Sequence, residues 1–380
     1  MIFYNKPYIT GKEFQYIESA IANRHLSGNG KYTNLCQQFF VEKYGFKKCL
    51  LTTSCTDALE MCAILLNIQP GDEVIMPSFT FVSTANAFIL RGAKIILADT
   101  NSNNPNIDEN NIEKLITKNT KAIVVVHYAG IACNMDSIMA IANKHNVFVI
   151  EDAAQAVDNF FINNNNVKQP LGSVGHLAAF SFHESKNIQC GEGGMLVVND
   201  GRFIKRAEII WEKGTNRAAF FRGEVDKYNW VDVGSSFLPS EITAAFLYAQ
   251  LQALDAIQKI RKEKWQLYYN GLLSLQEKQK LILPKVPEYA TNNAHIFYVV
   301  CKNLTERNKL ILFLKEKGIQ SMFHYPGLHL SPFFLNTHLK TLELLNTEKF
   351  SDCLLRLPLY IELEEEKINF IISLIYEFFQ

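Results

Sequence analysis

The sequence predicts an α/β protein with a large domain built on a mostly parallel sheet and a small C-terminal α/β domain. Through the first half of the 380 residues, short apolar runs rich in β-branched residues alternate with stretches of helical periodicity. Near-continuous apolar strands separated by helices are typical of a parallel sheet that is covered on both faces. After a long helical stretch, a shorter strand and helix pattern begins near His295. A chain of this length can bury two cores of that kind.

The expected strands of the large domain are short and apolar. They cover residues 48–52, 73–76, 93–97, 122–127 and 147–150, and a closely spaced pair follows at 176–181 and 195–199. Helices are expected between them, at 54–66, at 80–90 and in the Ala-rich segment before Val147. Gln69-Pro-Gly71 is a turn signal between the first of these helices and the next strand.

The C-terminal part is expected to form a separate unit. A helical stretch from Ser240 to Leu275 leads into it, and a strand at 295–301, a helix and a strand at 320–323 follow. We therefore predict a large domain over residues 1–250 and a small domain over residues 251–380.

Composition argues against several classes of protein. Lys+Arg and Asp+Glu number 38 each, so no net charge favours nucleic acid or an anionic membrane. No apolar run approaches the roughly 18 residues of a membrane-spanning helix, and the N-terminus lacks the pattern of a signal peptide. The eight cysteines are scattered without a CxxC pair, so we expect reduced thiols of a cytoplasmic protein and no metal site.

Asp152 and Lys186 are the residues most informative about chemistry. Asp152 ends the apolar strand that begins at Val147, and Lys186 stands before the Gly-rich segment Gly191–Gly194. A lysine amine can hold an aldehyde cofactor covalently, and a carboxylate can keep a pyridine nitrogen protonated. The two residues in this order predict a site for pyridoxal phosphate (PLP). Without a cofactor, a buried Asp152 would need a structural arginine or lysine instead.

Small hydroxyl residues lie where the first strand turns into a helix. Ser54, Cys55 and Thr56 open that helix, where unpaired amides and the helix dipole favour a phosphate. Ser181, five residues before Lys186, could add a hydroxyl to the phosphate site. The alternative for the helix start is an ordinary Ser or Thr N-cap.

Two further side chains are candidates for contact with the cofactor, and a histidine lies near Lys186 in the sequence. Phe81 could stack on a planar ring, although an isolated phenylalanine is more often a core residue. Gln155, three residues after Asp152, could reach the phenolic oxygen of the cofactor. His183 is either a polar group near the site or a packed strand residue.

Taken together, these segments resemble one family. Ser54–Thr56, Pro77–Phe81, Glu151–Gln155 and Ser181–Gly194 occur as in the DegT/DnrJ/EryC1/StrS sugar aminotransferases. The similarity covers essentially the whole chain and implies the PLP-dependent transferase fold type I, which is like that of aspartate aminotransferase. Within the family, the chain resembles most the branch of enterobacterial common antigen synthesis. This resemblance rests on segments 68–77, 126–130, 212–217, 221–223, 226–228 and 323–325.

The resemblance also implies a reaction and partners. Its substrate would be a nucleotide-linked 4-keto-6-deoxyhexose, such as dTDP-4-keto-6-deoxy-D-glucose, and its product the 4-amino-4,6-dideoxy sugar of galacto configuration. L-Glutamate would donate the amino group. The family's sites lie between subunits, so we expect a homodimer with the segment Arg217–Trp230 near the neighbour's cofactor. Ser236 stands where many members have an asparagine that reaches the neighbour's phosphate.

The nucleotide-sugar end of the site needs cations or hydrogen-bond donors. The candidates are Lys31, Arg217, Arg222, His324, Tyr325 and His329. Arginine suits a bidentate phosphate contact best, whereas the histidines could instead be packed against the sheet of the small domain.

Other functions stay open at this stage. The enzyme could form a 3-amino sugar or a gluco-configured product, or the chain could be a PLP-binding protein without catalytic activity. Related sugar dehydratases carry histidine in place of the lysine, so Lys186 argues against them. A nicotinamide dehydrogenase is disfavoured because no strand is followed by G-x-G-x-x-G.

Overall fold

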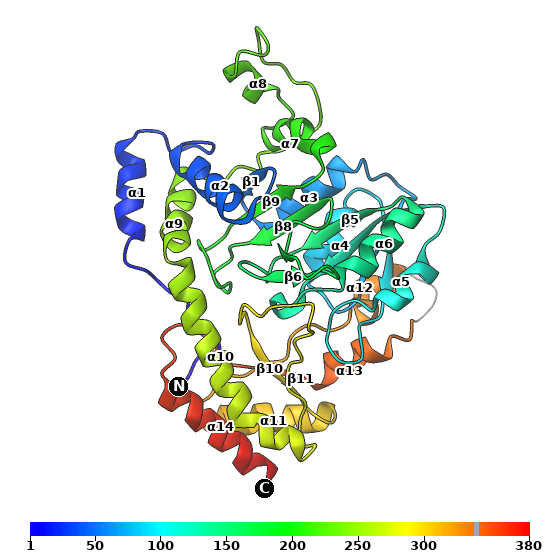
Figure 1. The fold of residues 1–380 in the computed structure, drawn as a ribbon, viewed down its shortest axis with the longest axis vertical. Helices are drawn as coiled ribbons and strands as arrows, with labels where there is room; N and C mark the ends of the chain where they lie inside the picture. The colour runs from blue at the N-terminus through cyan, green and yellow to red at the C-terminus, as the bar shows by residue number, and fades with distance from the viewer. Residues whose placement is uncertain (338–341) are drawn as a thin grey trace.

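The computed structural model describes residues 1–337 and 342–380, over which a seven-stranded sheet forms the centre of the molecule (Figure 1). Its strand order is β1-β9-β8-β5-β4-β2-β3. The strands are β1 (Cys49–Thr52), β2 (Glu73–Pro77), β3 (Lys94–Ala98), β4 (Thr120–Val126), β5 (Phe148–Asp152), β8 (Leu177–Ser181) and β9 (Gly194–Val198). Strands β3, β2, β4, β5 and β8 run parallel, and β9 is antiparallel to both of its neighbours. The predicted mostly parallel α/β fold is confirmed.

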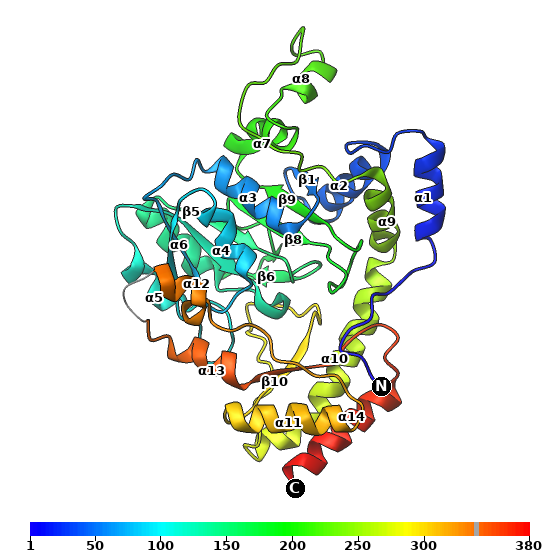
Figure 2. The ribbon, with the colours of Figure 1, turned by 180° about the vertical axis from the view of Figure 1, so that it is seen from behind.

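Helices cover both faces of this sheet (Figures 1 and 2). On one face, α2 (Lys31–Tyr44), α5 (Glu109–Leu115), α6 (Met135–His145) and α9 (Glu241–Gln252) share a buried cluster with strand residues such as Leu51. On the other, α3 (Cys55–Leu65), α4 (Val82–Ile89) and α7 (Ile204–Trp211) share a cluster with Leu50. Successive strand residues point to opposite faces, so a sheet covered on both sides needs apolar strands throughout.

A small unit lies below the sheet and is built on β10 (Phe297–Val300) and β11 (Leu354–Leu357), which pair antiparallel. α10 (Leu254–Glu277), α11 (Leu304–Glu316) and α14 (Glu365–Phe379) bury a third apolar cluster against these strands. The N-terminus also reaches this unit, where the Ile2 amide donates to the Gly318 carbonyl at 2.8 Å. A separate cluster is consistent with the division at residue 250, which stays a prediction.

Short elements complete the described chain. They are α1 (Glu13–Ala22), β6 (Phe160–Ile162), β7 (Lys168–Pro170), α8 (Arg217–Phe221), α12 (Pro332–Thr337), α13 (Leu345–Cys353) and 3₁₀ turns at Tyr128–Gly130, Gly201–Phe203 and Leu328–Leu330. α8 lies on an arm that projects from the body of the molecule in both ribbon views. On this arm Phe221 is 69% exposed and Trp230 is 82% exposed. Exposed aromatic side chains on a projecting arm are typical of a surface that contacts another chain.

Two expected elements differ from the structure. The helix predicted from Ser240 to Leu275 is divided into α9 and α10 at Ala253, whose backbone (φ −101°, ψ 2°) is not helical. The strand predicted at 320–323 is only a bridge between Met322 and Arg356. The next carbonyl, that of Phe323, accepts from the Arg356 guanidinium instead of a backbone amide, so the strand ladder stops there.

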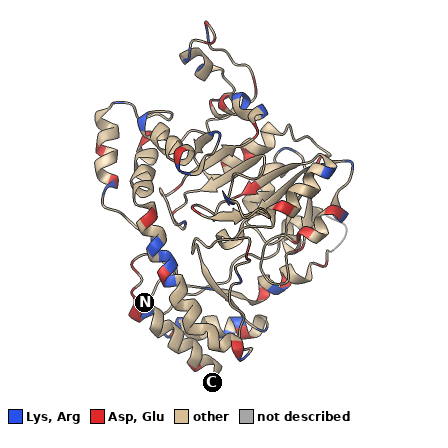
Figure 3. Ribbon diagram, in the orientation of Figure 1, with Lys and Arg blue, Asp and Glu red and all other residues tan. Residues whose placement is uncertain are grey.

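Charged side chains of both signs occur on the same elements of the described chain (Figure 3). This distribution matches the even numbers of acidic and basic residues. Over residues 1–337 and 342–380, none of the helices combines the length and the apolar character needed to cross a lipid bilayer.

Candidate active site

A cavity of about 730 Å³ lies where the parallel strands end. Val126, Asp152 and Ser181, the last residues of β4, β5 and β8, line it. Ligands of open α/β sheets bind at this carboxyl edge. Many of the predicted site residues line the same cavity, namely Ser54, Cys55, Thr56, Phe81, Asp152, Gln155, Ser181, Lys186, His324 and Tyr325.

Asp152 is a buried carboxylate that has hydrogen bonds and no ion pair among the described residues. Thr84 Oγ1 donates to its Oδ2 at 2.7 Å, and the Ala154 amide donates to its Oδ1 at 3.2 Å. Burial raises the pKa of Asp152, and these hydrogen bonds and the charge of Lys186 offset that rise only in part. Because a buried charge without a counter-ion is costly, the site is suited to a ligand that brings a cation, such as a protonated pyridine nitrogen.

Lys186 lies in the turn between β8 and β9, where its backbone amide donates to the His183 carbonyl at 2.9 Å. Its Nζ lines the cavity and has neither a hydrogen-bond nor an ion-pair partner in the described part of the chain. Burial lowers the pKa of Lys186, and the nearby carboxylate of Asp152 offsets this effect only in part. A desolvated lysine loses its proton more readily, which makes the amine a better nucleophile.

The N-terminus of α3 faces the same cavity. Ser54 is its N-cap, and the Ser54 Oγ accepts from the Asp57 amide at 3.0 Å, so the ordinary cap is present. The amides of Cys55 and Thr56 precede the first intrahelical bonds and stay available to an anion. Gly194 of β9 lies against this turn, where a Cβ would overlap the backbone of Ser54 and Cys55. A cap and a phosphate site are therefore compatible here.

The N-terminus of α2, by contrast, is occupied by a side chain of the protein itself. Glu241, which is buried at the start of α9, accepts from the amides of Gly30 at 3.0 Å, Tyr32 at 2.6 Å and Thr33 at 3.0 Å. A carboxylate in this place satisfies the unpaired amides and the helix dipole. Of these two helix starts, that of α3 is the open one.

Gln155 connects the sheet edge to the C-terminal part of the chain. Its Oε1 accepts from the Ala129 amide at 2.7 Å, and its Nε2 donates to the Tyr325 hydroxyl at 3.0 Å. Ala129 has φ 56°, which is uncommon for a residue with a Cβ. The side chain of Gln155 therefore fixes this turn, and its contact with a cofactor oxygen stays a prediction.

Aromatic side chains form one wall of the cavity. Tyr325 stacks on His324 with ring centroids 3.7 Å apart and lies 6.2 Å from Phe81. His324 Nδ1 is 2.7 Å from the Tyr128 hydroxyl, and burial holds the pKa of His324 well below its usual range. Phe81 is 57% exposed, so its ring is available to a planar ligand rather than packed in the core.

These features fit PLP. Lys186 offers an amine to its aldehyde, Asp152 a carboxylate to its pyridine nitrogen, and the start of α3 amides to its phosphate. The exposed ring of Phe81 is placed on the same cavity, where it can cover the planar ring.

Two of the predicted nucleotide-binding residues lie on or beside the arm, outside the lining of this cavity. Arg222 forms ion pairs with Glu208 at 3.0 Å and Glu224 at 2.7 Å. The Arg217 guanidinium lies 5.2 Å from the centroid of the Phe221 ring. Within one chain, neither arginine reaches the residues around Lys186.

The remaining predicted residues have local partners. His329 is buried, as the packed alternative expected, but its Nδ1 lies 2.7 Å from Ser78 Oγ, just after β2 of the large sheet, rather than against the sheet of the small domain. Lys31 lies at the start of α2, and Ser236 forms a backbone bridge with Glu212. His183 lines the cavity with its Nδ1 2.8 Å from Ser185 Oγ, which matches the polar alternative.

Sequence reasoning did not find Tyr4, His295 and Arg356, which also line the cavity. Tyr4 and Arg356 lie near opposite ends of the chain, so no spacing rule connects them to Lys186. The available signal was an arginine within an otherwise apolar strand, Leu354–Leu357. A charge placed inside a buried strand usually has a specific partner or function.

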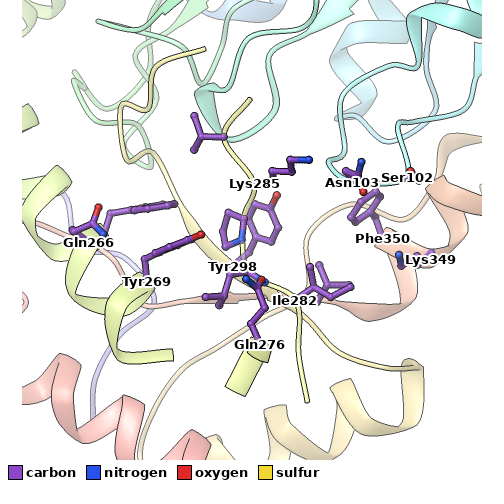
Figure 4. A pocket seen from close by; sticks show the side chains of 15 residues that line it. Ser102, Asn103, Gln266, Tyr269, Gln276, Ile282, Lys285, Tyr298, Lys349 and Phe350 are labelled. Atoms are coloured by element: carbon purple, nitrogen blue, oxygen red, sulfur yellow. The ribbon is translucent and has the colours of Figure 1, made fainter. Parts of the chain in front are cut away.

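A second cavity, of about 410 Å³, lies where the small unit meets the large one (Figure 4). Its lining includes Trp265 and Tyr269, whose rings stack 5.2 Å apart, and the side chains of Lys285 and Lys349. It contains none of the predicted site residues.

Comparisons with known proteins show which family this chain resembles. Residues 7–376 match the model of the DegT/DnrJ/EryC1/StrS aminotransferase family. The chain is 32% identical to the spore coat polysaccharide biosynthesis protein SpsC of Bacillus subtilis, over 97% of this chain and 95% of that protein.

Solved structures are similar over nearly the full length. An aminotransferase from Psychrobacter cryohalolentis has a TM-score of 0.91 at 26% identity, covering 98% of both chains. The PLP form of Spr1654 from Streptococcus pneumoniae has a TM-score of 0.89 at 23% identity, covering 98% of this chain and 97% of the other, and so shares the fold. This protein therefore belongs to the DegT/DnrJ/EryC1/StrS aminotransferase family.

Proposed function

We propose that this protein is an aminotransferase that transfers an amino group to a keto sugar carried on a nucleotide. PLP is its cofactor. One observation carries the proposal. Among the described residues, the amine of Lys186 has no partner and the carboxylate of Asp152 has no counter-ion, and both face one cavity beside the open start of α3.

Each residue of the site has its own role in amino transfer. When bound, PLP withdraws electrons from the carbon that bears the amino group and makes its proton acidic. Lys186 would hold the cofactor covalently through its amine, and the free amine would carry a proton to and from the reacting carbon. Asp152, held by Thr84 and Ala154, keeps the pyridine nitrogen protonated.

The phosphate is assigned to the start of α3. The amides of Cys55 and Thr56 would donate to its oxygens, and the hydroxyls of Ser54 and Ser181 would add further donors. Phe81 would cover the ring of the cofactor, and Gln155 would contact its phenolic oxygen. Ser236 is proposed for the neighbouring subunit's phosphate.

The proposed substrates are L-glutamate and dTDP-4-keto-6-deoxy-D-glucose, and the product is the 4-amino-4,6-dideoxy sugar of galacto configuration. This assignment follows the resemblance to the dTDP-4-amino-4,6-dideoxygalactose transaminase of enterobacterial common antigen synthesis. Similarity to a polysaccharide biosynthesis protein supports the sugar class. A 3-amino or gluco-configured product is the alternative.

The active form is proposed to be a homodimer. Arg217 and Arg222 lie on or beside a projecting arm with exposed aromatic side chains, so they would reach the cavity of the partner subunit rather than their own. Lys31, His324 and Tyr325 complete the proposed contacts with the nucleotide sugar, whereas His329 is buried against Ser78 and is not assigned to them. The eight free cysteines support a cytoplasmic location.

The test is an assay of the purified protein with L-glutamate and dTDP-4-keto-6-deoxy-D-glucose, followed by NMR of the product. An amine at C4 in axial orientation is the expected result. An equatorial amine, or one at C3, would select the alternatives. Bound PLP without any amino transfer would mean that the chain is a non-catalytic PLP-binding protein.

A further inference from the structure

The second cavity, where the small unit meets the large one, has a positively charged lining. Lys285 lies in the segment after α10 and Lys349 lies on α13, and neither has an ion-pair or hydrogen-bond partner in the described part of the chain. The described residues of this lining include no aspartate or glutamate. In a chain with equal numbers of acidic and basic residues, two unpaired lysines in a lining without an acid favour an anion at this place.

Tyr298 supplies a buried hydrogen-bond donor to the same cavity. Only 3% of the residue is exposed, and its hydroxyl has no partner among the described residues. The hydroxyl still remains accessible from the cavity that Tyr298 lines (Figure 4). Burial raises the pKa of Tyr298, so the group keeps its proton and can donate to an anion. Buried polar groups usually have partners, so a free one at a cavity indicates a ligand.

Tyr269 provides a flat surface beside these groups. Its ring stacks on that of Trp265, with 5.2 Å between the centroids and 13° between the planes. Trp265 is itself fixed, because it is buried and its Nε1 donates to the Ile296 carbonyl at 3.2 Å. Tyr269 remains partly exposed. A rigid aromatic side chain of this kind can stack on the ring of a ligand.

The size and the polar lining of the cavity narrow the class of ligand. Its volume of about 410 Å³ lies in the range of small-molecule sites. The amide groups of Gln266 and Gln276 can bond to the hydroxyl or carbonyl groups of such a molecule. Two lysines on separate elements suit a phosphate, which carries up to two negative charges and several acceptor oxygens.

Tyr298 also connects this cavity to the candidate active site. Its ring packs edge-on against that of Tyr128, with the centroids 5.9 Å apart. The Tyr128 hydroxyl lies 2.7 Å from His324 Nδ1, and His324 stacks on Tyr325 in the lining of the active-site cavity. A ligand that displaces Tyr298 would therefore disturb the aromatic wall of the active site through packed side chains.

We propose that the second cavity binds a phosphorylated small molecule that carries a ring. Its phosphate contacts Lys285, Lys349 and the Tyr298 hydroxyl, its ring lies on Tyr269, and its binding acts on the active site through Tyr128. This site is separate from that of the substrates and goes beyond the proposed aminotransferase function. A nucleotide and a sugar phosphate share this chemistry and differ in the ring that they offer to Tyr269.

The test measures binding to the PLP-loaded protein by calorimetry, with dTDP, glucose 1-phosphate and inorganic pyrophosphate as probes. Lys285→Gln combined with Lys349→Gln is compared with Lys262→Gln combined with Lys280→Gln, which removes the same charge outside both cavities. We expect one binding event of dTDP or of glucose 1-phosphate to weaken about 10- to 100-fold in the first double variant only, as for lost charge-assisted hydrogen bonds. Binding at the active site should be the same in both double variants.

Tyr298→Phe keeps the ring and removes the hydroxyl, so the same event should weaken about 2- to 10-fold. Pyrophosphate should bind at least about tenfold more weakly, because it has no ring to stack. The tighter of the other two probes distinguishes a nucleotide from a sugar phosphate. Equal affinities in the two double variants would overturn the site, and pyrophosphate binding as tight as that of both other probes would overturn the contact with Tyr269.

The effect on the active site is measured as the KM for the keto sugar with and without the tighter probe. Competition at the active site is common to all variants, so the difference between the wild type and Lys285→Gln combined with Lys349→Gln isolates the second cavity. We expect a difference of at least about twofold, and identical responses would overturn the connection through Tyr298. A wild type without amino transfer would count against the proposed function, whereas the binding measurements would still decide the site. Thermal denaturation of each variant separates a folding defect from a binding defect.

Discussion

Lys186 combines burial with the absence of a hydrogen-bond partner among the described residues, and a reactive amine needs both. We expect Lys186→Ala to abolish turnover and to remove the borohydride-reducible link to the cofactor, because no other lysine lines the described part of the cavity. Mass spectrometry after borohydride treatment checks this, with Lys285→Ala as control. A reducible adduct in the alanine variant would show that a different lysine is used.

Asp152→Asn keeps the size of the side chain and removes its charge. Folding and cofactor binding should largely survive, because the asparagine oxygen can still accept from the Ala154 amide while its NH2 group donates to Thr84 Oγ1. Turnover should fall about 10²- to 10³-fold, the usual effect of losing one charge-assisted contact in a dry site. Single-turnover kinetics checks this, and wild-type rates would remove Asp152 from the mechanism.

The raised pKa of Asp152 also predicts a pH dependence of stability. In the cofactor-free protein the folded state binds this proton more tightly than the unfolded chain does. The contribution of Asp152 to stability is therefore greatest below its ordinary pKa and decreases as the pH rises through the folded value. Without cofactor, the wild type should lose stability relative to Asp152→Asn from about pH 4 upward. Thermal denaturation at several pH values tests this; parallel profiles would contradict it.

At the scale of elements, the contact between β9 and the start of α3 depends on Gly194. A methyl group there would overlap the backbone of Ser54 and Cys55, so Gly194→Ala must move the strand or the helix start. We expect a loss of about 1–3 kcal/mol in the free energy of unfolding and weaker PLP binding, measured by denaturation and by fluorescence titration. Gly201→Ala is the matched control, because a Cβ at Gly201 meets nothing within 4 Å. Unchanged PLP affinity in Gly194→Ala would place the phosphate elsewhere.

Elements were predictable where one local rule decides the structure. The strand that ends at Asp152 and the helix after Ser54 follow from apolar runs and a capping residue. The break at Ala253 was not predictable, since alanine favours helix and no Gly or Pro marks the site. The segment around Met322 was predicted as a strand from its composition, but the Arg356 guanidinium competes for the Phe323 carbonyl.

For the whole molecule, the arm with exposed Phe221 and Trp230 predicts assembly into a homodimer. We expect sedimentation to show a dimer, and Trp230→Ser combined with Phe221→Ser to weaken it. Activity should fall in proportion to the monomer fraction if the partner completes each site. A fully active monomer would contradict this prediction.

The cavity itself could be predicted only in part. Sequence order placed Asp152, Lys186 and Ser54 on one edge, because parallel strands share the direction of their ends. Tyr4 and Arg356 join them only through the packing of the small unit, which no local pattern describes. Arg217 and Arg222 do not line the cavity, and the homodimer that would bring them to a partner's cavity stays a prediction.

Glu241 has a consequence for how the cofactor finds its position. Its carboxylate occupies the start of α2 just as a phosphate group could occupy the start of α3. The consecutive helices α2 and α3 therefore both present unpaired amides to an anion. At α2 the Glu241 carboxylate already occupies these amides, so a free anion cannot bind there. Of these two helix starts, the fold thus leaves only that of α3 open to the cofactor phosphate. The blocked site at α2 contributes to this selectivity as much as the attraction at α3 does.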